Sequence, residues 1–129
     1  MRRLRWLLVP VVVAGIMTCS DAEAPAGPGW LEVRLSSPNG DDGGIMLVVR
    51  GGPIDSVRSP FANAFARRLS ASEWRVIVAG NVTSAVVARV CVPDLDAAAQ
   101  YAATVEQVAS GTTYAQRATA GYALTVARP

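Results

Sequence analysis

The feature that most constrains the fold of this chain is a two-residue alternation of apolar and polar side chains, which begins near residue 30. The alternating apolar residues are Leu31, Val33, Leu35, Trp74, Val76, Val78, Tyr122, Leu124 and Val126. Successive side chains of a strand point to opposite faces, so this pattern predicts strands that bury one face. Residues 45–49 and 86–92 are further apolar strand candidates, and Gly-, Pro-, Asn- and Asp-rich turns separate the segments. We therefore predict an all-β, antiparallel sandwich of about seven to nine strands.

Two segments are compatible with more than one secondary structure. Residues 61–69 place apolar side chains at both helical and strand spacing, which leaves helix and strand open. Residues 95–109 are rich in alanine. There we expect a short helical turn at about 94–99, followed by a strand at about 101–108, because the second half contains β-branched residues.

The rhythm of the strands over about 100 residues resembles that of immunoglobulin-like and cohesin-type sandwich modules of cell envelopes. The resemblance rests on three segments: a strand at 44–51 that ends in Gly-Gly, a strand at 74–80, and a strand at 86–93 that an Asp follows. It implies a sandwich of two sheets. It implies no ligand, because many unrelated functions share this architecture.

The N-terminus has the order of an export signal. Arg2, Arg3 and Arg5 precede an apolar run at residues 6–17, and a positive start followed by a short apolar segment is typical of a secretory leader. A helix of that length covers roughly 18 Å, whereas the apolar core of a bilayer is about 30 Å thick. We expect the arginines to stay in the cytoplasm and the domain to be exported.

Residues 16–19 read Ile-Met-Thr-Cys and resemble the lipobox of bacterial lipoprotein signals. The resemblance implies cleavage before Cys19, acylation of that cysteine, and a membrane-anchored protein that faces the periplasm or the cell exterior. An ordinary signal peptide or an uncleaved anchor is the alternative. The expected organisation is a signal or anchor at 1–19, a flexible tether rich in Ala, Pro and Gly at 20–29, and a β-sandwich domain at 30–129.

The composition excludes several kinds of chemistry. The chain has no His, and its 12 basic residues are all Arg. Histidine-based triads and zinc sites are therefore absent, as are Schiff-base and phosphate-loop lysines. We predict no enzymatic activity, no cofactor and no bound metal. Cys91 should pack as a small apolar residue, and a Cys19–Cys91 disulfide is the alternative if Cys19 is not acylated.

The chain has one cluster of acidic and amide groups, in the segment 39–44. Asn39, Asp41 and Asp42 are weak candidates for calcium binding, since calcium prefers oxygen ligands. The spacing is not that of a calcium loop, and we expect a solvated hairpin turn in which the adjacent side chains diverge. Asp94 and Asp96 are expected to cap a helical turn rather than to act as a hydrolytic pair.

Trp30, Arg67 and Arg75 are weak candidates for contacts with a partner. We expect no nucleic-acid partner, because without the three leader arginines 9 Arg face 10 acidic residues. The expected function is a non-enzymatic, membrane-tethered envelope protein that binds another envelope or membrane protein. It could serve as an accessory subunit of a larger complex, such as a respiratory or photosynthetic assembly. The alternative is an extracytoplasmic carbohydrate- or calcium-binding module.

Overall fold

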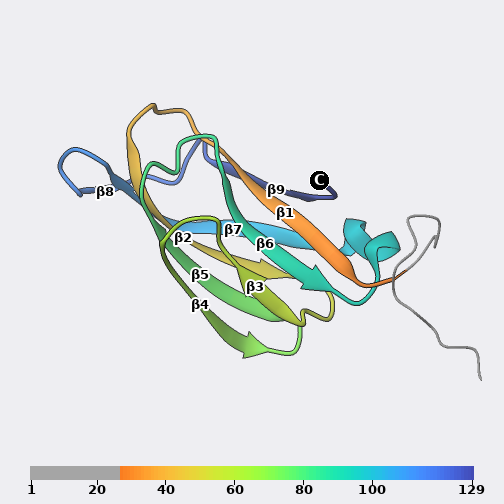
Figure 1. Cartoon of the computed structure of the whole chain (residues 1–129). Helices are drawn as coiled ribbons and strands as arrows, with labels where there is room; N and C mark the ends of the chain where they lie inside the picture. Colours follow the sequence, from red (N-terminus) through yellow and green to blue (C-terminus); the bar gives the residue numbers. More distant parts are fainter. Residues whose placement is uncertain (1–26) are drawn as a thin grey trace, which may run out of the picture.

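Two antiparallel sheets lie face to face in the computed structural model, which describes residues 27–129 (Figure 1). The four-stranded sheet has the order β3-β6-β1-β9 and the five-stranded sheet the order β4-β5-β2-β7-β8. The strands are β1 (Gly29–Ser36), β2 (Asp42–Arg50), β3 (Ser56–Arg58), β4 (Asn63–Ser70), β5 (Glu73–Ala79), β6 (Val86–Val92), β7 (Ala102–Ser110), β8 (Gln116–Arg117) and β9 (Ala123–Ala127). The predicted all-β antiparallel sandwich is confirmed.

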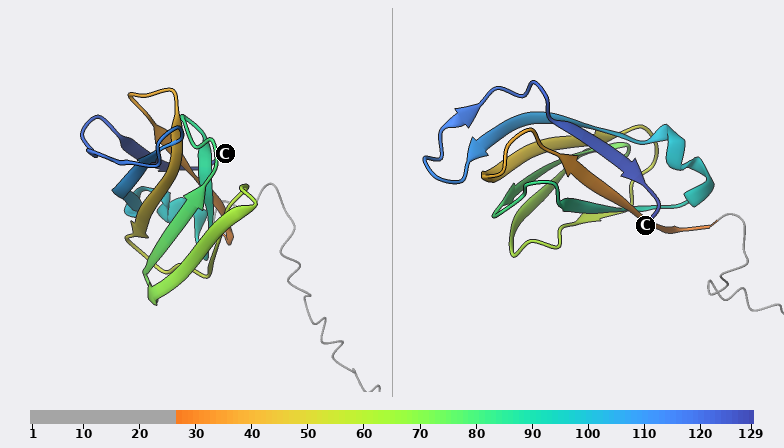
Figure 2. Two further views of the ribbon diagram at one scale, coloured as in Figure 1. Left: turned by 90° about the vertical axis from the view of Figure 1, so that its left-hand side faces the viewer. Right: turned by 90° about the horizontal axis from the view of Figure 1, so that it is seen from above.

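Alternation along the strands builds the core between the two sheets. Leu31 and Val33 of β1 are fully buried, as are Leu47 of β2 and Val78 of β5. These side chains point into the sandwich from both layers. Figure 2 shows the two sheets from two further directions. Burying one such side chain contributes roughly 1.5–3 kcal/mol, so the alternating residues supply most of the driving force for this packing.

The segment between β1 and β2 corrects one prediction. β1 pairs with β6 and β9, whereas β2 pairs with β5 and β7. The residues at 37–41 therefore carry the chain from one sheet to the other, and the predicted hairpin turn is wrong. Turn-forming residues are needed at such a crossing as much as in a hairpin, so local composition does not distinguish the two.

Both ambiguous segments have a defined structure. The first contains strand β4, whose backbone pairs with β5 over most of its length. The second forms the 3-10 helix η1 (Leu95–Gln100) followed by β7, as expected. The side chain of Asp94 accepts a hydrogen bond from the backbone N–H of Asp96 at 2.9 Å, so the expected capping role of Asp94 is confirmed.

Candidate functional site

A polar cluster forms around Asp42, the first residue of β2, which is 1% exposed. Its carboxylate accepts hydrogen bonds from the hydroxyl of Tyr122 at 2.6 Å and from Nη1 of Arg117 at 2.9 Å. The hydroxyl of Ser37 donates to the second carboxylate oxygen. The backbone N–H of Asp42 donates to the hydroxyl of Thr83 at 3.1 Å. We call these five residues the Asp42 cluster.

The neighbouring carboxylate converges on the same guanidinium. Nη2 of Arg117 lies 2.7 Å from Oδ1 of Asp41, while Nη1 binds Asp42. Nδ2 of Asn39 donates to the Tyr122 hydroxyl at 2.7 Å. The expectation of a solvated turn with diverging carboxylates is therefore wrong, because one arginine from β8 binds both and Asp42 is buried.

The electrostatics of the cluster favour the charged forms. Burial on its own would raise the pKa of Asp42, but hydrogen bonds from Ser37, Tyr122 and Arg117 outweigh it and hold that pKa below its usual value. The hydrogen bond to Asp41 raises the pKa of Arg117 above its usual value. Asp42 and Arg117 are therefore both ionised at neutral pH.

The arrangement of the Asp42 cluster is that of a link between the two sheets. Ser37 and Tyr122 adjoin β1 and β9 of the four-stranded sheet, whereas Asp42 and Arg117 belong to the five-stranded sheet. Within residues 27–129, no group of three or more acidic or cysteine side chains is placed to hold a metal ion. The carboxylates of the weak calcium candidates bind Arg117 instead, so the cluster ties the layers together.

An apolar surface covers part of the outer face of the five-stranded sheet. Phe65 on β4 is 63% exposed and lies directly opposite Ile77 on β5, which is 40% exposed. Ile77 in turn lies opposite Met46 on β2. Tyr114, which is 78% exposed, borders a hollow of ≈ 380 Å³ that Ile77 and Met46 also line. We call Phe65, Ile77, Met46 and Tyr114 the apolar face.

Sequence reasoning missed the apolar face, although one signal for it was present. Val76 and Val78 point into the core, so Ile77 between them must point outward. An outward Ile forms an apolar patch only when its neighbours on the adjacent strands are apolar as well. Phe65 carried no comparable signal, because its strand could have presented either face to the core.

The predicted contact residues lie on two different faces. Arg67 and Arg75 are directly opposite each other on β4 and β5, next to the apolar face. The Nε and Nη2 nitrogens of Arg75 donate hydrogen bonds to the carboxylate of Glu106 on β7, at 3.2 and 3.4 Å. This ion pair crosses the central strand β2 at the level of Val48. Val48 is 1% exposed, although its side chain is not part of the core between the two sheets. Among the described residues, Arg67 forms no ion pair.

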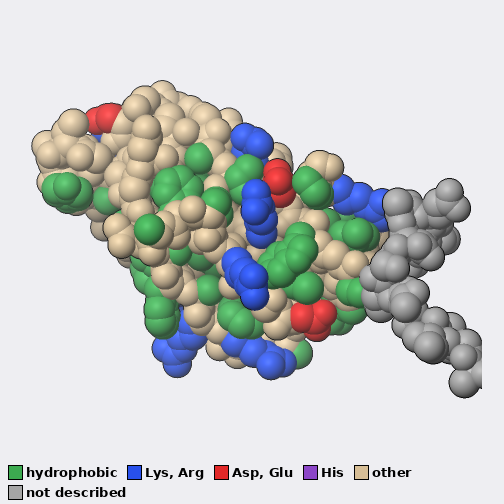
Figure 3. All heavy atoms as spheres, in the orientation of Figure 1, with side chains coloured by type: hydrophobic (Ala, Val, Ile, Leu, Met, Phe, Trp, Pro, Cys, Tyr) green, Lys and Arg blue, Asp and Glu red, His purple; other side chains and the backbone are tan. Residues whose placement is uncertain are grey.

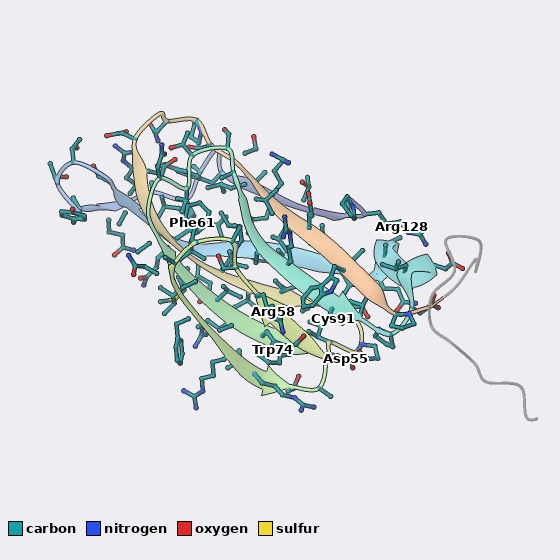
Figure 4. All side chains as sticks on the ribbon, viewed as in Figure 1. Asp55, Arg58, Phe61, Trp74, Cys91 and Arg128 are labelled. Carbon is teal, nitrogen blue, oxygen red and sulfur yellow. The ribbon has the colours of Figure 1, made fainter. Side chains whose placement is uncertain are left out.

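Trp30 belongs to the opposite side of the sandwich. It lies on the outer face of the four-stranded sheet, and the guanidinium carbon of Arg58 is 5.5 Å from the centroid of its ring. Cys91 is directly opposite Trp30 on β6 and is half-buried, and it has no disulfide partner within residues 27–129. Figure 4 shows Arg58 and Cys91 on the adjacent strands β3 and β6. The predicted lipidation site, Cys19, lies outside the described residues.

No model of a known protein family, no curated protein and no solved structure matches the chain. Across residues 27–129, none of the helical segments has the length and apolar character required to cross a membrane.

Proposed function

We propose that the chain is a non-enzymatic, lipid-anchored protein of the cell envelope whose domain binds a protein partner through the apolar face. The observation that carries the proposal is the adjacency of Phe65 and Ile77, which are 63% and 40% exposed on neighbouring strands. Isolated apolar residues on a surface are ordinary, but a contiguous patch that includes aromatic side chains is typical of an interface.

The charges beside the apolar face define the chemistry of the partner. Arg67 is exposed without an ion pair among the described residues. Arg75 is neutralised by Glu106, so the net charge next to Phe65 is positive. The complementary surface has an apolar centre and carboxylates at its rim, because opposite charges across an interface speed association and select the partner. Such a partner is an envelope or membrane protein for which this chain is an accessory subunit.

A role without catalysis is supported by the composition and by the Asp42 cluster. The chain has no His and no Lys. Among the described residues, Asp42 is the buried carboxylate, and donors from three side chains hold it in its charged form. A carboxylate that is saturated in this way is poorly suited to proton transfer.

Export and anchoring are supported by the leader and by the Ile-Met-Thr-Cys sequence that ends at Cys19. Growth with radioactive palmitate tests the anchor. We expect label in the wild-type chain and none in a Cys19→Ala variant. An unlabelled wild-type chain would overturn the lipid anchor without affecting the interface proposal.

Site-specific photo-crosslinking in the native membrane tests the interface. A photoreactive amino acid at position 77 should give one adduct of discrete mass, and Phe65→Asp should abolish it. Thr125→Asp is the matched control, because Thr125 is an exposed outward residue of the other sheet. Both variants should keep the thermal midpoint of the wild type, since exposed substitutions change stability by about 0.5 kcal/mol or less. An adduct that survives Phe65→Asp, or that forms equally from position 125, would overturn the proposal.

A further inference from the structure

Two arginines face each other directly on the outer side of the four-stranded sheet. Arg58 of β3 and Arg89 of β6 are opposite partners in the strand pairing, and both are exposed. Like charges that are directly opposite on antiparallel strands destabilise the pair. Neither arginine forms an ion pair with any described residue. The fold therefore keeps two positive charges together without a counter-charge from its own side chains.

The surrounding charges increase the imbalance. Glu32 of β1 lies on the other side of Arg89, but its carboxylate contacts Arg34 at 4.0 Å. One carboxylate thus lies among three guanidinium groups. In Figure 3, which looks onto this side of the molecule, basic side chains gather along the middle of the sheet. The excess of positive charge on this surface favours binding of an anion.

The two facing arginines line a hollow with a definite shape. Its volume is ≈ 280 Å³, and its lining residues are Trp30, Arg58, Ser59, Pro60 and Arg89. The position of Arg58 over the indole ring of Trp30 restrains its guanidinium. The Ser59 hydroxyl already donates to the carbonyl of Val87 at 2.7 Å. The charged donors that remain for a ligand are therefore the N–H groups of the two arginines.

We propose that this hollow, the arginine pocket, binds a phosphate ester, and that in the cell the phosphate belongs to an anionic phospholipid headgroup. Guanidinium groups bind phosphate oxygens through paired hydrogen bonds. A tetrahedral phosphate has enough oxygens to accept from two guanidinium groups on different strands. Trp30 and Pro60 add apolar surface that suits the glycerol and upper acyl region of a lipid.

The choice of a lipid rests on the proposed anchor at Cys19. Trp30 follows Cys19 by 11 residues, and a chain of that length spans at most about 40 Å. Headgroups are thus within reach of the arginine pocket, which lies at the start of β1. Anionic lipids attract basic surfaces within about 10 Å. Contact through this sheet would turn the apolar face, on the opposite sheet, away from the membrane and toward a partner.

Titrations of the full chain in neutral detergent test the inference. The probes are inorganic phosphate, dihexanoyl phosphatidylglycerol, and dihexanoylglycerol as the matched lipid without phosphate. The readout is the ¹⁵N resonances of the arginine side chains, assigned by their loss in Arg58→Gln and Arg89→Gln. We expect phosphatidylglycerol to shift the signals of Arg58 and Arg89, and dihexanoylglycerol to leave them unchanged. Arg89→Gln should weaken the binding at least tenfold, and Arg67→Gln on the other sheet should not.

Each remaining outcome has a defined meaning. Binding of inorganic phosphate without binding of the lipid would keep the phosphate site and overturn the membrane source. Equal binding of dihexanoylglycerol, no binding of any probe, or equal weakening by Arg67→Gln would overturn the pocket. In phosphate-free buffer, Arg89→Gln should melt no lower than the wild type, because it removes a repulsion; this shows that the variant folds. Crosslinking from position 77 should persist in Arg89→Gln, so failure of the pocket and failure of the protein interface can be told apart.

Discussion

Replacing Asp42 by Ala should cause a large loss of stability, because Asp42 is a buried carboxylate at the start of β2. The variant loses hydrogen bonds from Ser37, Tyr122 and Arg117 to a carboxylate that is 1% exposed. One hydrogen bond to a buried charged group contributes about 1.5–3 kcal/mol. Arg117 keeps its 2.7 Å contact with Asp41, so the losses do not add fully. We expect a decrease of about 3 kcal/mol in the free energy of unfolding, which lowers the melting temperature by about 12–24 °C.

Urea unfolding of the full chain in neutral detergent, followed by circular dichroism, measures this loss. Asp41→Ala is the matched control, because its side chain is 44% exposed and binds the same arginine. An exposed ion pair contributes about 0.2–1 kcal/mol, so the control should remain close to the wild type. Equal losses in the two variants, or a loss below about 1 kcal/mol for Asp42→Ala, would refute the view that burial makes the contribution of Asp42 to stability larger than that of Asp41.

The lowered pKa of Asp42 predicts that the stability of the fold depends on pH. The pKa of Asp42 in the folded state lies below its ordinary value, so the unfolded chain takes up the proton first as the pH falls. The contribution of Asp42 is therefore complete well above the unfolded-state pKa of 3.8, begins to fall near about pH 5, and is lost as the pH falls through the folded-state pKa. The stability difference between the wild type and Asp42→Asn should shrink between pH 5 and pH 3. A difference that stays constant over that range would contradict the assignment.

Two further substitutions test the packing of the domain, each by its urea midpoint. Gly51→Ala should lose about 3 kcal/mol, because Gly51 has φ +133° and an added Cβ would collide with the carbonyl oxygen of Gln100. Gly40→Ala is its control, since nothing lies within 4 Å of that position; equal losses would rule out the collision as the cause. Tyr101→Phe should lose about 1–2 kcal/mol, because the hydroxyl of this 6% exposed residue donates to the carbonyl of Pro53 at 2.6 Å. An unchanged midpoint would mean that this bond contributes nothing net.

The strands could be predicted because their signal is local. Leu31 and Val33 sit two residues apart and are both buried, as the alternation requires. The helical turn before β7 was also predictable, because Asp94 follows a proline and precedes an alanine-rich stretch. In each case the residues that determine the local structure are only a few positions apart in the sequence.

The Asp42 cluster could not be predicted because its partners are remote in the chain. Arg117 and Tyr122 follow Asp42 by 75 and 80 residues. An Asp among glycines has the same local appearance whether it is solvated or buried against an arginine. The crossing between the sheets decides which it is, and that crossing depends on the strand pairing of the whole domain.

The exposure of the apolar face could not be predicted from the sequence for a different reason. Phe65 and Leu69 have the spacing of a buried strand face, yet they are 63% and 39% exposed. β4 is one of the two edge strands of its sheet. A pattern of alternation says which side chains share a face, but only the neighbouring layer determines which face is covered.

The lengths of the outermost strands have a consequence for self-association. In the described part of the chain, β3 and β8 contain three and two residues, β9 contains five, and β4 contains eight. Long unpaired edges recruit other chains into continuous sheets and lead to aggregation, and short edges do not. β4 is thus the edge most open to polymerisation, and it carries the adjacent charges of Arg67 and Arg68. Charged residues on an edge strand oppose edge-to-edge pairing, so acidic groups that neutralised these arginines would also remove that protection.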